Sequence, residues 1–345
     1  MSVRLRVCHR LADVGPAERW SALRARPPAS ITGSQPWLSA AAVTVDRGDR
    51  PYLLIVHDDD RLLALMPLKL QEHDGGVRVR FAASPNNDLS DVLAVPGHEV
   101  TAGALIVSEL ERLLARGCSV SLDSVDPHGL LRRIAGERDL FSWSSDECAP
   151  AMDLRGPWRD AASPQRRSQW DRRMRRLREA GPVELCRVEG ESLSRELPAF
   201  LRLRAARRAV KGHDDLPPTA FLTQAASELA SSGRCILMEL RVNGHPAAAD
   251  LYLIEHPVAL MWLRGLDPRW QRFSCGHLLL RASAEAFAQE GFETLDLGRG
   301  DEPYKAYFGA QRRVLLRASA GASERSAGQS PATGALVRRH GRLSR

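Results

Sequence analysis

The order of hydrophobic and polar positions in the first half of the chain predicts helices at 17–24 and 35–43, then strands, a helix and a further strand. Two apolar runs, at 51–57 and 61–70, flank three consecutive aspartates and predict a β-hairpin. A third strand, VRVRFAA, follows an Asp-Gly-Gly turn and spans 77–83. Apolar residues recur at helical spacing over 99–116, and the apolar run SVSLDSV at 119–125 predicts the last strand of this half.

The second half repeats this order after a set of helices. The segment SPQRRSQWDRRMRRLREAG predicts a helix with Ser163 as its N-cap, proline at its first position and Gly181 at its end. An Asn-Gly pair between two later apolar runs predicts a second hairpin. Helices are predicted at 192–210, 218–231 and 277–291, and strands at 234–242, 245–255, 257–266 and 292–298.

Chain length and this repeated order predict two domains. The chain has 345 residues, of which 43% are hydrophobic, enough for two ordinary cores. A proline-rich break at 150–157 divides them, so we expect domains at 1–155 and 156–318. Residues 319–345 are rich in alanine, glycine, serine and arginine, which predicts a disordered basic tail. The fold class expected is α/β of the α+β type, with a mixed, mostly antiparallel sheet and flanking helices in each domain.

Two kinds of sequence signal are missing, and their absence shapes the expected location and cofactors. No apolar run is long enough to cross a bilayer, and the first residues lack the apolar core of a secretory signal. The six cysteines are single, with no CxxC pair and no histidine cluster at metal-ligand spacing. We therefore expect a cytoplasmic protein with reduced thiols and no metal.

The charge composition indicates an anionic partner and singles out one lysine. The formal net charge is +7, which favours binding to nucleic acid, a phosphorylated cofactor or a membrane surface. Only Lys69, Lys211 and Lys305 are lysines among the 49 basic residues. Lysine offers a compact point charge where arginine offers a planar fork. Lys305 lies in the aromatic segment GDEPYKAYFG, so it is either a surface residue or a site residue.

The junction between the strand at 257–266 and the next helix is a candidate anion site. The loop RWQRFSCG leads into the helix at His277, and backbone amides at a helix start lack partners within the helix. Arg269 and Arg272 lie just before this helix start. The alternative is an ordinary strand-to-helix turn. Cys275 at the same position is a weaker candidate for a nucleophile, because no histidine partner is visible in the sequence.

Four segments, in this order, carry a resemblance to a known family. They are RRSQWDRRMRRLREAG, LRVNGHPAAADLYLI, LRGLDPRWQRFSCGHLLLRASAEAFAQEGFETLDLG and GDEPYKAYFG. Together they resemble the Fem-like branch of the GNAT acyltransferase superfamily, often labelled CelD or cellulose-biosynthesis-associated acetyltransferases. The first half, with PYLLIVHDDDRLLALMPLKL, is similar to the degenerate N-terminal GNAT-like domain of that group. The resemblance implies two tandem GNAT-like domains, an activated acyl donor and an amine acceptor.

The resemblance also implies roles for individual residues. In GNAT enzymes the donor is acyl-CoA, and its pyrophosphate would bind here at Arg272, Ser274, Gly276 and His277. In Fem peptidyltransferases the donor is aminoacyl-tRNA, and the lysine of a similar aromatic motif lies at the reaction centre. That position corresponds to Lys305, preceded by Tyr304. A fixed cation there would stabilise the oxyanion that forms when an amine attacks the acyl carbonyl. Asp296 and Glu302 would hold the acceptor ammonium or relay its proton.

The sequence therefore predicts an N-acyltransferase and leaves its donor open. The leading hypothesis is direct attack of an amine on acetyl-CoA or another acyl-CoA. The loop before the helix departs from the usual GNAT pattern, because Arg272 precedes Gly276 by four residues and Leu278 follows. This departure and the arginine-rich helix at 164–179 keep aminoacyl-tRNA as an alternative donor. A third reading is a GNAT-like binding module without catalysis. The acceptor is left open among small-molecule, sugar and peptide amines.

Overall fold

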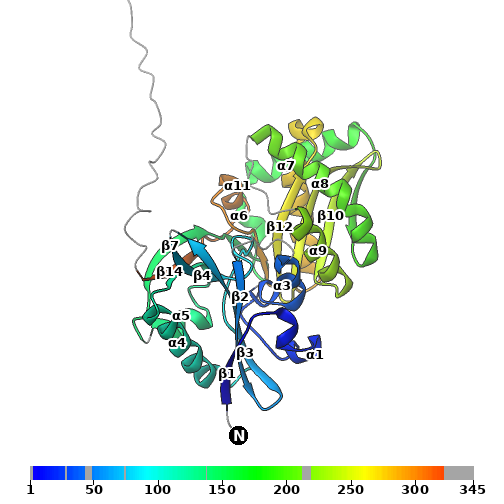
Figure 1. The fold of residues 1–345 in the computed structure, drawn as a ribbon. Coiled ribbons are helices and arrows are strands. Elements are labelled where there is room, and N and C mark those ends of the chain that lie inside the picture. Colours follow the sequence, from blue (N-terminus) through cyan, green and yellow to red (C-terminus); the bar gives the residue numbers. More distant parts are fainter. Residues whose placement is uncertain are drawn as a thin grey trace, which may run out of the picture.

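The computed structural model describes residues 3–27, 29–42, 49–73, 75–136, 138–211 and 219–321, with side chains from 208 to 211 left undescribed. Within these ranges the chain forms two mixed sheets flanked by helices (Figure 1). The predicted α/β class with two mostly antiparallel sheets is therefore confirmed.

The first sheet is built mainly from the first half of the chain. Its order is β1-β2-β3-β4-β6-β14-β7, with β5 paired to β3; β4 and β6 run parallel and the other named pairs are antiparallel. The strands are β1 (Val3–Cys8), β2 (Asp49–Asp58), β3 (Arg61–His73), β4 (Gly76–Phe81), β5 (Leu93–Ala94), β6 (Ser119–Val125), β7 (Ser142–Cys148) and β14 (Val314–Ala320). The associated helices are η1 (Leu11–Val14), α1 (Ala17–Trp20), α2 (Ala29–Thr32), α3 (Gln35–Ala42), α4 (Glu99–Ala115) and α5 (Leu130–Gly136).

The second sheet carries the candidate site. Its order is β8-β13-β12-β11-β10-β9, and only β12 and β13 pair in parallel. The strands are β8 (Ala151–Asp153), β9 (Val183–Val188), β10 (Cys235–Val242), β11 (His245–Glu255), β12 (Val258–Leu266) and β13 (Thr294–Asp296). The helices are α6 (Trp158–Ala161), α7 (Pro164–Glu179), α8 (Glu191–Lys211), α9 (Thr219–Ser231), η2 (Pro268–Phe273), α10 (Cys275–Gln289) and α11 (Pro303–Ala306).

Three apolar cores hold these layers together. α4 and α5 pack on one face of the first sheet, and α10 with α7 covers one face of the second. A shared core lies between the sheets, where α3 packs against α9 (Figure 1). Trp37 is fully buried at its centre, with ring centroids 5.1 Å from Phe221 and 5.0 Å from Trp262. The two halves of the chain are therefore joined by a common hydrophobic interior.

The chain crosses between the sheets near both predicted domain limits. β8 pairs with β13 in the second sheet, and β14 returns to the first sheet between β6 and β7. The division at 155/156 stays a prediction. The tail predicted from residue 319 begins inside β14, and residues 322–345 lie outside the described residues.

The pairing of β12 with β13 creates an opening beside β12. The two strands pair only from Val258 to Leu260 on β12 and from Thr294 to Asp296 on β13. β12 then continues to Leu266 without a strand partner on that side in the described part of the chain. The segment that follows β13 turns away toward α11, so the second half of β12 faces a gap that side chains line. The candidate site forms here.

Candidate functional site

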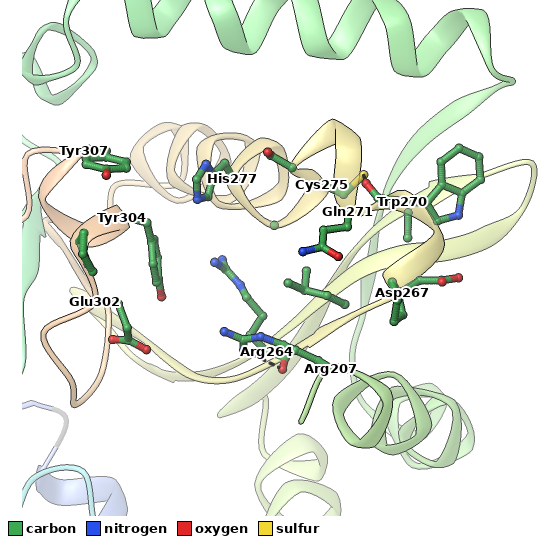
Figure 2. A pocket seen from close by; sticks show the side chains of 16 residues that line it. Arg207, Arg264, Asp267, Trp270, Gln271, Cys275, His277, Glu302, Tyr304 and Tyr307 are labelled. Carbon is green, nitrogen blue, oxygen red and sulfur yellow. Dashed lines mark hydrogen bonds between the residues drawn. The ribbon is translucent and has the colours of Figure 1, made fainter. Parts of the chain in front are cut away.

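A cavity of about 490 Å³ lies where the end of β12 meets η2, α10 and α11. Figure 2 shows aromatic rings from α11 and the imidazole of α10 on one side of this hollow, with arginines at its floor. We call it the donor cavity. The side chains labelled in Figure 2 are Arg207, Arg264, Asp267, Trp270, Gln271, Cys275, His277, Glu302, Tyr304 and Tyr307.

The amino end of α10 opens into the donor cavity. Its N-cap, Ser274, has a left-handed backbone with φ of 54° and gives no side-chain hydrogen bond to the helix. The amides of His277 and Leu278 bond to the Ser274 carbonyl oxygen at 2.9 and 3.3 Å. A Cβ on Gly276 would lie 3.0 Å from Leu266 Cδ2, so glycine lets the helix start approach β12 closely. The positive end of the helix dipole therefore points at the cavity, which suits an anion.

A buried ion pair crosses from β11 to β12 beside the helix start. Arg264 donates from Nε and Nη2 to the two carboxylate oxygens of Asp250, each at 2.6 Å. The exposed fraction of these side chains is 5% and 0%. Burial lowers the pKa of Arg264, but the Asp250 carboxylate more than offsets this, so the pKa lies above its usual value. Tyr252 donates to the same carboxylate at 3.3 Å.

Arg207, on α8, brings a cation with no carboxylate partner among the residues described. Its Nη1 donates to the Arg264 carbonyl oxygen at 3.2 Å. Its Nε is buried without a hydrogen-bond partner in the described structure. Burial and the neighbouring Arg264 lower the pKa of Arg207. An anionic ligand in the donor cavity would relieve this unfavourable charge.

An aromatic wall faces these arginines. The ring of His277 stacks on Tyr304, with centroids 5.7 Å apart, and meets Tyr307 edge-on at 6.5 Å. The guanidinium of Arg166 lies 3.5 Å from the centroid of the Tyr307 ring. Burial raises the pKa of Tyr304, so its phenol stays protonated and can donate a proton. Burial and the nearby Arg264 lower the pKa of His277 to about 4, so this imidazole is neutral at pH 7.

The lowered pKa of His277 predicts a pH-dependent loss of stability. Below pH 6.5 the unfolded chain takes up a proton on this histidine, and the folded chain takes it up only near pH 4. The wild type should therefore lose more stability than His277→Gln as the pH falls from 7 to 4, by on the order of 2 kcal/mol. Urea unfolding of both proteins across this range measures the difference. His245→Gln is the control at an exposed position, and parallel curves for wild type and His277→Gln would contradict the prediction.

Lys305 is buried behind the aromatic wall, with an exposed fraction of 2%. Its ammonium donates to the carbonyl oxygens of Gly298, Arg299 and Gly300 at 2.9, 2.8 and 2.9 Å. Glu302 Oε2 lies 3.0 Å from the same nitrogen. The ammonium therefore fixes the turn after β13. Its placement at the reaction centre stays a prediction.

A second cavity, of about 420 Å³, continues the site along the free edge of β12. We call it the acceptor cavity. It shares four lining residues with the donor cavity: Arg207, Arg264, Glu302 and Tyr304. Asp88 and Glu147, from the part of the chain that builds the first sheet, line its other side. The two cavities therefore adjoin at Tyr304 and Glu302.

The structure brings five of the eight predicted catalytic and donor-binding residues into the donor cavity: Glu302, Tyr304, Ser274, Gly276 and His277. The weaker candidate Cys275 lines the same cavity. Three others lie elsewhere. Asp296 is buried, accepts from the Gly298 amide at 2.9 Å and pairs with Arg313, and it lines neither cavity. Arg272 is exposed, with its guanidinium over the Phe273 ring at 4.8 Å, and Lys305 lines only the acceptor cavity.

Sequence reasoning missed the charged residues that dominate the floor of the site, Asp250, Arg264 and Arg207. The sequence does carry a signal for Asp250 and Arg264. Each is the only charge within an otherwise apolar stretch of its strand, and the two lie at nearly mirrored positions about the turn between β11 and β12. Charges of opposite sign buried in neighbouring strands are expected to pair. No comparable local signal marks Arg207 in the arginine-rich α8.

No group of three or more His, Cys, Asp or Glu side chains in the described ranges could hold a metal ion. No helix within the same ranges is long and apolar enough to span a membrane.

Comparison with known proteins shows what the fold and the second half of the chain are similar to. Residues 164–306 match the family model described as an acetyltransferase (GNAT) domain. The search of curated proteins found no match. A FemX crystal structure is similar with a TM-score of 0.61 and 10% identity, over 92% of this chain and 97% of that one.

Two further solved structures are similar to this chain. The C-terminal domain of a putative lysylphosphatidylglycerol synthetase from Agrobacterium fabrum has a TM-score of 0.54 and 12% identity, over 82% of this chain and 91% of that one. The L-PGS structure from Bacillus licheniformis has a TM-score of 0.53 and 12% identity, over 84% and 86%. The chain thus has a fold similar to those of FemX and the two synthetase structures, and its residues 164–306 match a GNAT acetyltransferase domain.

Proposed function

We propose that this protein is a cytoplasmic N-acyltransferase that moves an acyl group from an acyl-CoA, such as acetyl-CoA, to an amine. The observation that carries the proposal is the donor cavity. Its helix amino end favours an anion, and so does Arg207, which has no carboxylate partner in the described part of the chain. A pyrophosphate is such an anion. The pyrophosphate of the acyl-CoA would bind at Ser274 and Gly276, and its acyl group would point toward Tyr304.

The chemistry fits the point where the two cavities meet. An amine in the acceptor cavity attacks the acyl carbonyl carbon, a C–N bond forms, and the C–S bond then breaks. The departing thiolate takes a proton from Tyr304, whose raised pKa keeps it protonated. Glu302, whose side chain has an exposed fraction of 42%, accepts the proton that the amine loses. The positive charge of Arg264 lies within the same space and favours the oxyanion.

Donor binding tests this assignment directly. We expect acetyl-CoA or a longer acyl-CoA to stabilise the folded protein, by about 2.7 kcal/mol at a hundred times its Kd, as a rise in Tm. Arg207→Met should weaken that binding roughly tenfold or more, because a charge-assisted contact is lost. Arg272→Met is the matched control, since this side chain lies outside the donor cavity. A larger effect of Arg272→Met would assign the donor site to the loop before α10.

A second candidate donor, aminoacyl-tRNA, is favoured by α7. Four of its arginines are exposed and have no ion pair within the described ranges: Arg172, Arg175, Arg176 and Arg178. Arg166, on the same helix, contacts Tyr307, which lines the donor cavity. Binding to such a surface should fall steeply as salt rises.

One experiment distinguishes aminoacyl-tRNA from acyl-CoA as the donor. If tRNA is the donor, Arg172→Gln with Arg176→Gln should reduce tRNA affinity and flatten its salt dependence, by roughly 0.9 in the log-log slope for each lost contact. Arg61→Gln with Arg133→Gln is the control on exposed arginines of the first half. Failure to bind tRNA at low salt rules this donor out. Failure of transfer from both donors to small-molecule, sugar and peptide amines would favour a binding module.

A further inference from the structure

A third cavity, of about 340 Å³, lies far from the donor cavity, between the first helices of the chain and the second sheet. Glu255, at the end of β11, lines it. The donor cavity borders the opposite end of the β11–β12 hairpin, at Leu266, which pairs with Ala248. Along β11, Glu255 lies seven residues beyond Ala248, so the two cavities are separated by roughly 23 Å of strand. We call this space the junction cavity.

The polar groups of the junction cavity are incompletely paired. Glu255 Oε2 is buried and has no hydrogen-bond partner in the described structure. Its nearest cation is Arg234, with Nη2 3.9 Å from Oε1, which is beyond hydrogen-bonding distance. Burial raises the pKa of Glu255 and lowers that of Arg234, so neither charge is fully compensated by the other. Arg24 adds a second cation to the lining.

The remaining walls are mostly apolar. Trp20, Leu23 and Leu93 line the cavity with exposed fractions of 8%, 3% and 3%. Arg24 is fixed at the rim, because its Nη1 donates to the Leu23 carbonyl oxygen at 2.8 Å. The cavity thus combines two guanidinium groups, an apolar wall and the Glu255 carboxylate. Ser30 and the Ile31 backbone stabilise this carboxylate by hydrogen bonding, but its Oε2 lacks a donor in the described structure. This set of groups matches a small molecule with a carboxylate, an ammonium and an apolar side chain.

We infer that the junction cavity binds a free α-amino acid with an apolar side chain. Its carboxylate pairs with Arg24 and Arg234, its ammonium donates to Glu255 Oε2, and its side chain packs against Trp20 and Leu93. Such a ligand contacts both halves of the chain at once, since Arg24 precedes the first sheet's long hairpin and Arg234 precedes β10. Binding therefore stabilises the packing of the two halves against each other.

Isothermal titration calorimetry on the full chain tests the inference. The probes are L-leucine, 4-methylpentanoate, which lacks the ammonium, and 3-methylbutylamine, which lacks the carboxylate. L-leucine should bind at least tenfold more tightly than either analogue, because each analogue leaves a buried charge unpaired. Absence of measurable binding by L-leucine and by L-phenylalanine at 10 mM, roughly the weakest range this method detects, overturns the inference.

Two variants assign the contacts. Glu255→Gln should reduce L-leucine affinity at least tenfold and leave 4-methylpentanoate unchanged. Arg24→Gln, at an exposed position where folding is not at risk, should weaken L-leucine and 4-methylpentanoate alike. Unchanged L-leucine affinity in both variants overturns the inference. A loss of L-leucine affinity in Arg207→Met also overturns it, because the amino acid would then occupy the donor cavity.

Discussion

Asp250→Ala is expected to lower the free energy of unfolding by about 3–5 kcal/mol. The substitution leaves the guanidinium of Arg264 buried, with an exposed fraction of 5%, and removes both of its 2.6 Å hydrogen bonds. An uncompensated charge on a side chain with so little exposed surface is costly, because few water molecules can solvate it. Equilibrium unfolding in urea measures the loss. Donor binding should weaken as well, because Arg264 lines the donor cavity and would move to find another partner.

Two controls separate this effect from the loss of any ion pair. Asp171→Ala breaks the ion pair of Asp171 with Arg281. Because the Asp171 side chain has an exposed fraction of 55%, this substitution should lower the free energy of unfolding by no more than about 1 kcal/mol. The double variant Asp250→Leu with Arg264→Met replaces the buried pair by apolar side chains and should be more stable than Asp250→Ala. A cost for Asp250→Ala as small as that of Asp171→Ala would show that Arg264 is not held as the structure has it.

Local periodicity predicted most of the elements that build the fold. The two hairpins and the long helices follow from apolar runs and turn residues that act within one element. β7 was missed because its residues are largely exposed and polar, which hides the strand pattern. β9 was missed because it is a short strand with no buried residue. β14 was missed for a different reason. It pairs with β6 and β7, whose residues lie well over a hundred positions earlier, and no local pattern specifies such a long-range partner.

The same distinction between local patterns and long-range contacts explains which residues of the site could be predicted. Ser274, Gly276 and His277 follow from the strand-loop-helix order, and Tyr304 and Glu302 from a short aromatic segment, so local sequence was enough to propose them. Arg207 comes from α8, which packs against β12 only through the tertiary fold. The surroundings of Lys305 could not be predicted either. Its acceptors are backbone carbonyl oxygens, and every residue type offers those equally.

Lys305→Met should lower both stability and transfer, and it tests what this lysine does. The variant keeps an unbranched apolar side chain and leaves the carbonyl oxygens of residues 298–300 without their donor, at about 1–3 kcal/mol for each that water cannot reach. Because Gly298 and Gly300 line the acceptor cavity, the turn should shift there. We expect the free energy of unfolding to fall by at least about 3 kcal/mol, with kcat lower and KM for the acceptor raised.

Lys69→Met is the matched control for Lys305→Met. Lys69 is also largely buried, pairs with Asp49 at 2.6 Å and donates to the Ser84 carbonyl oxygen at 3.0 Å, but it lines neither the donor nor the acceptor cavity. Its loss should reduce stability and leave kcat and KM unchanged at a temperature where both variants are folded. If Lys305→Met instead lowers kcat alone, with stability and KM intact, the ammonium acts on the transition state directly. Lys305 would then be the oxyanion-stabilising cation that the sequence suggested, and its contacts to the turn would have to open during the reaction.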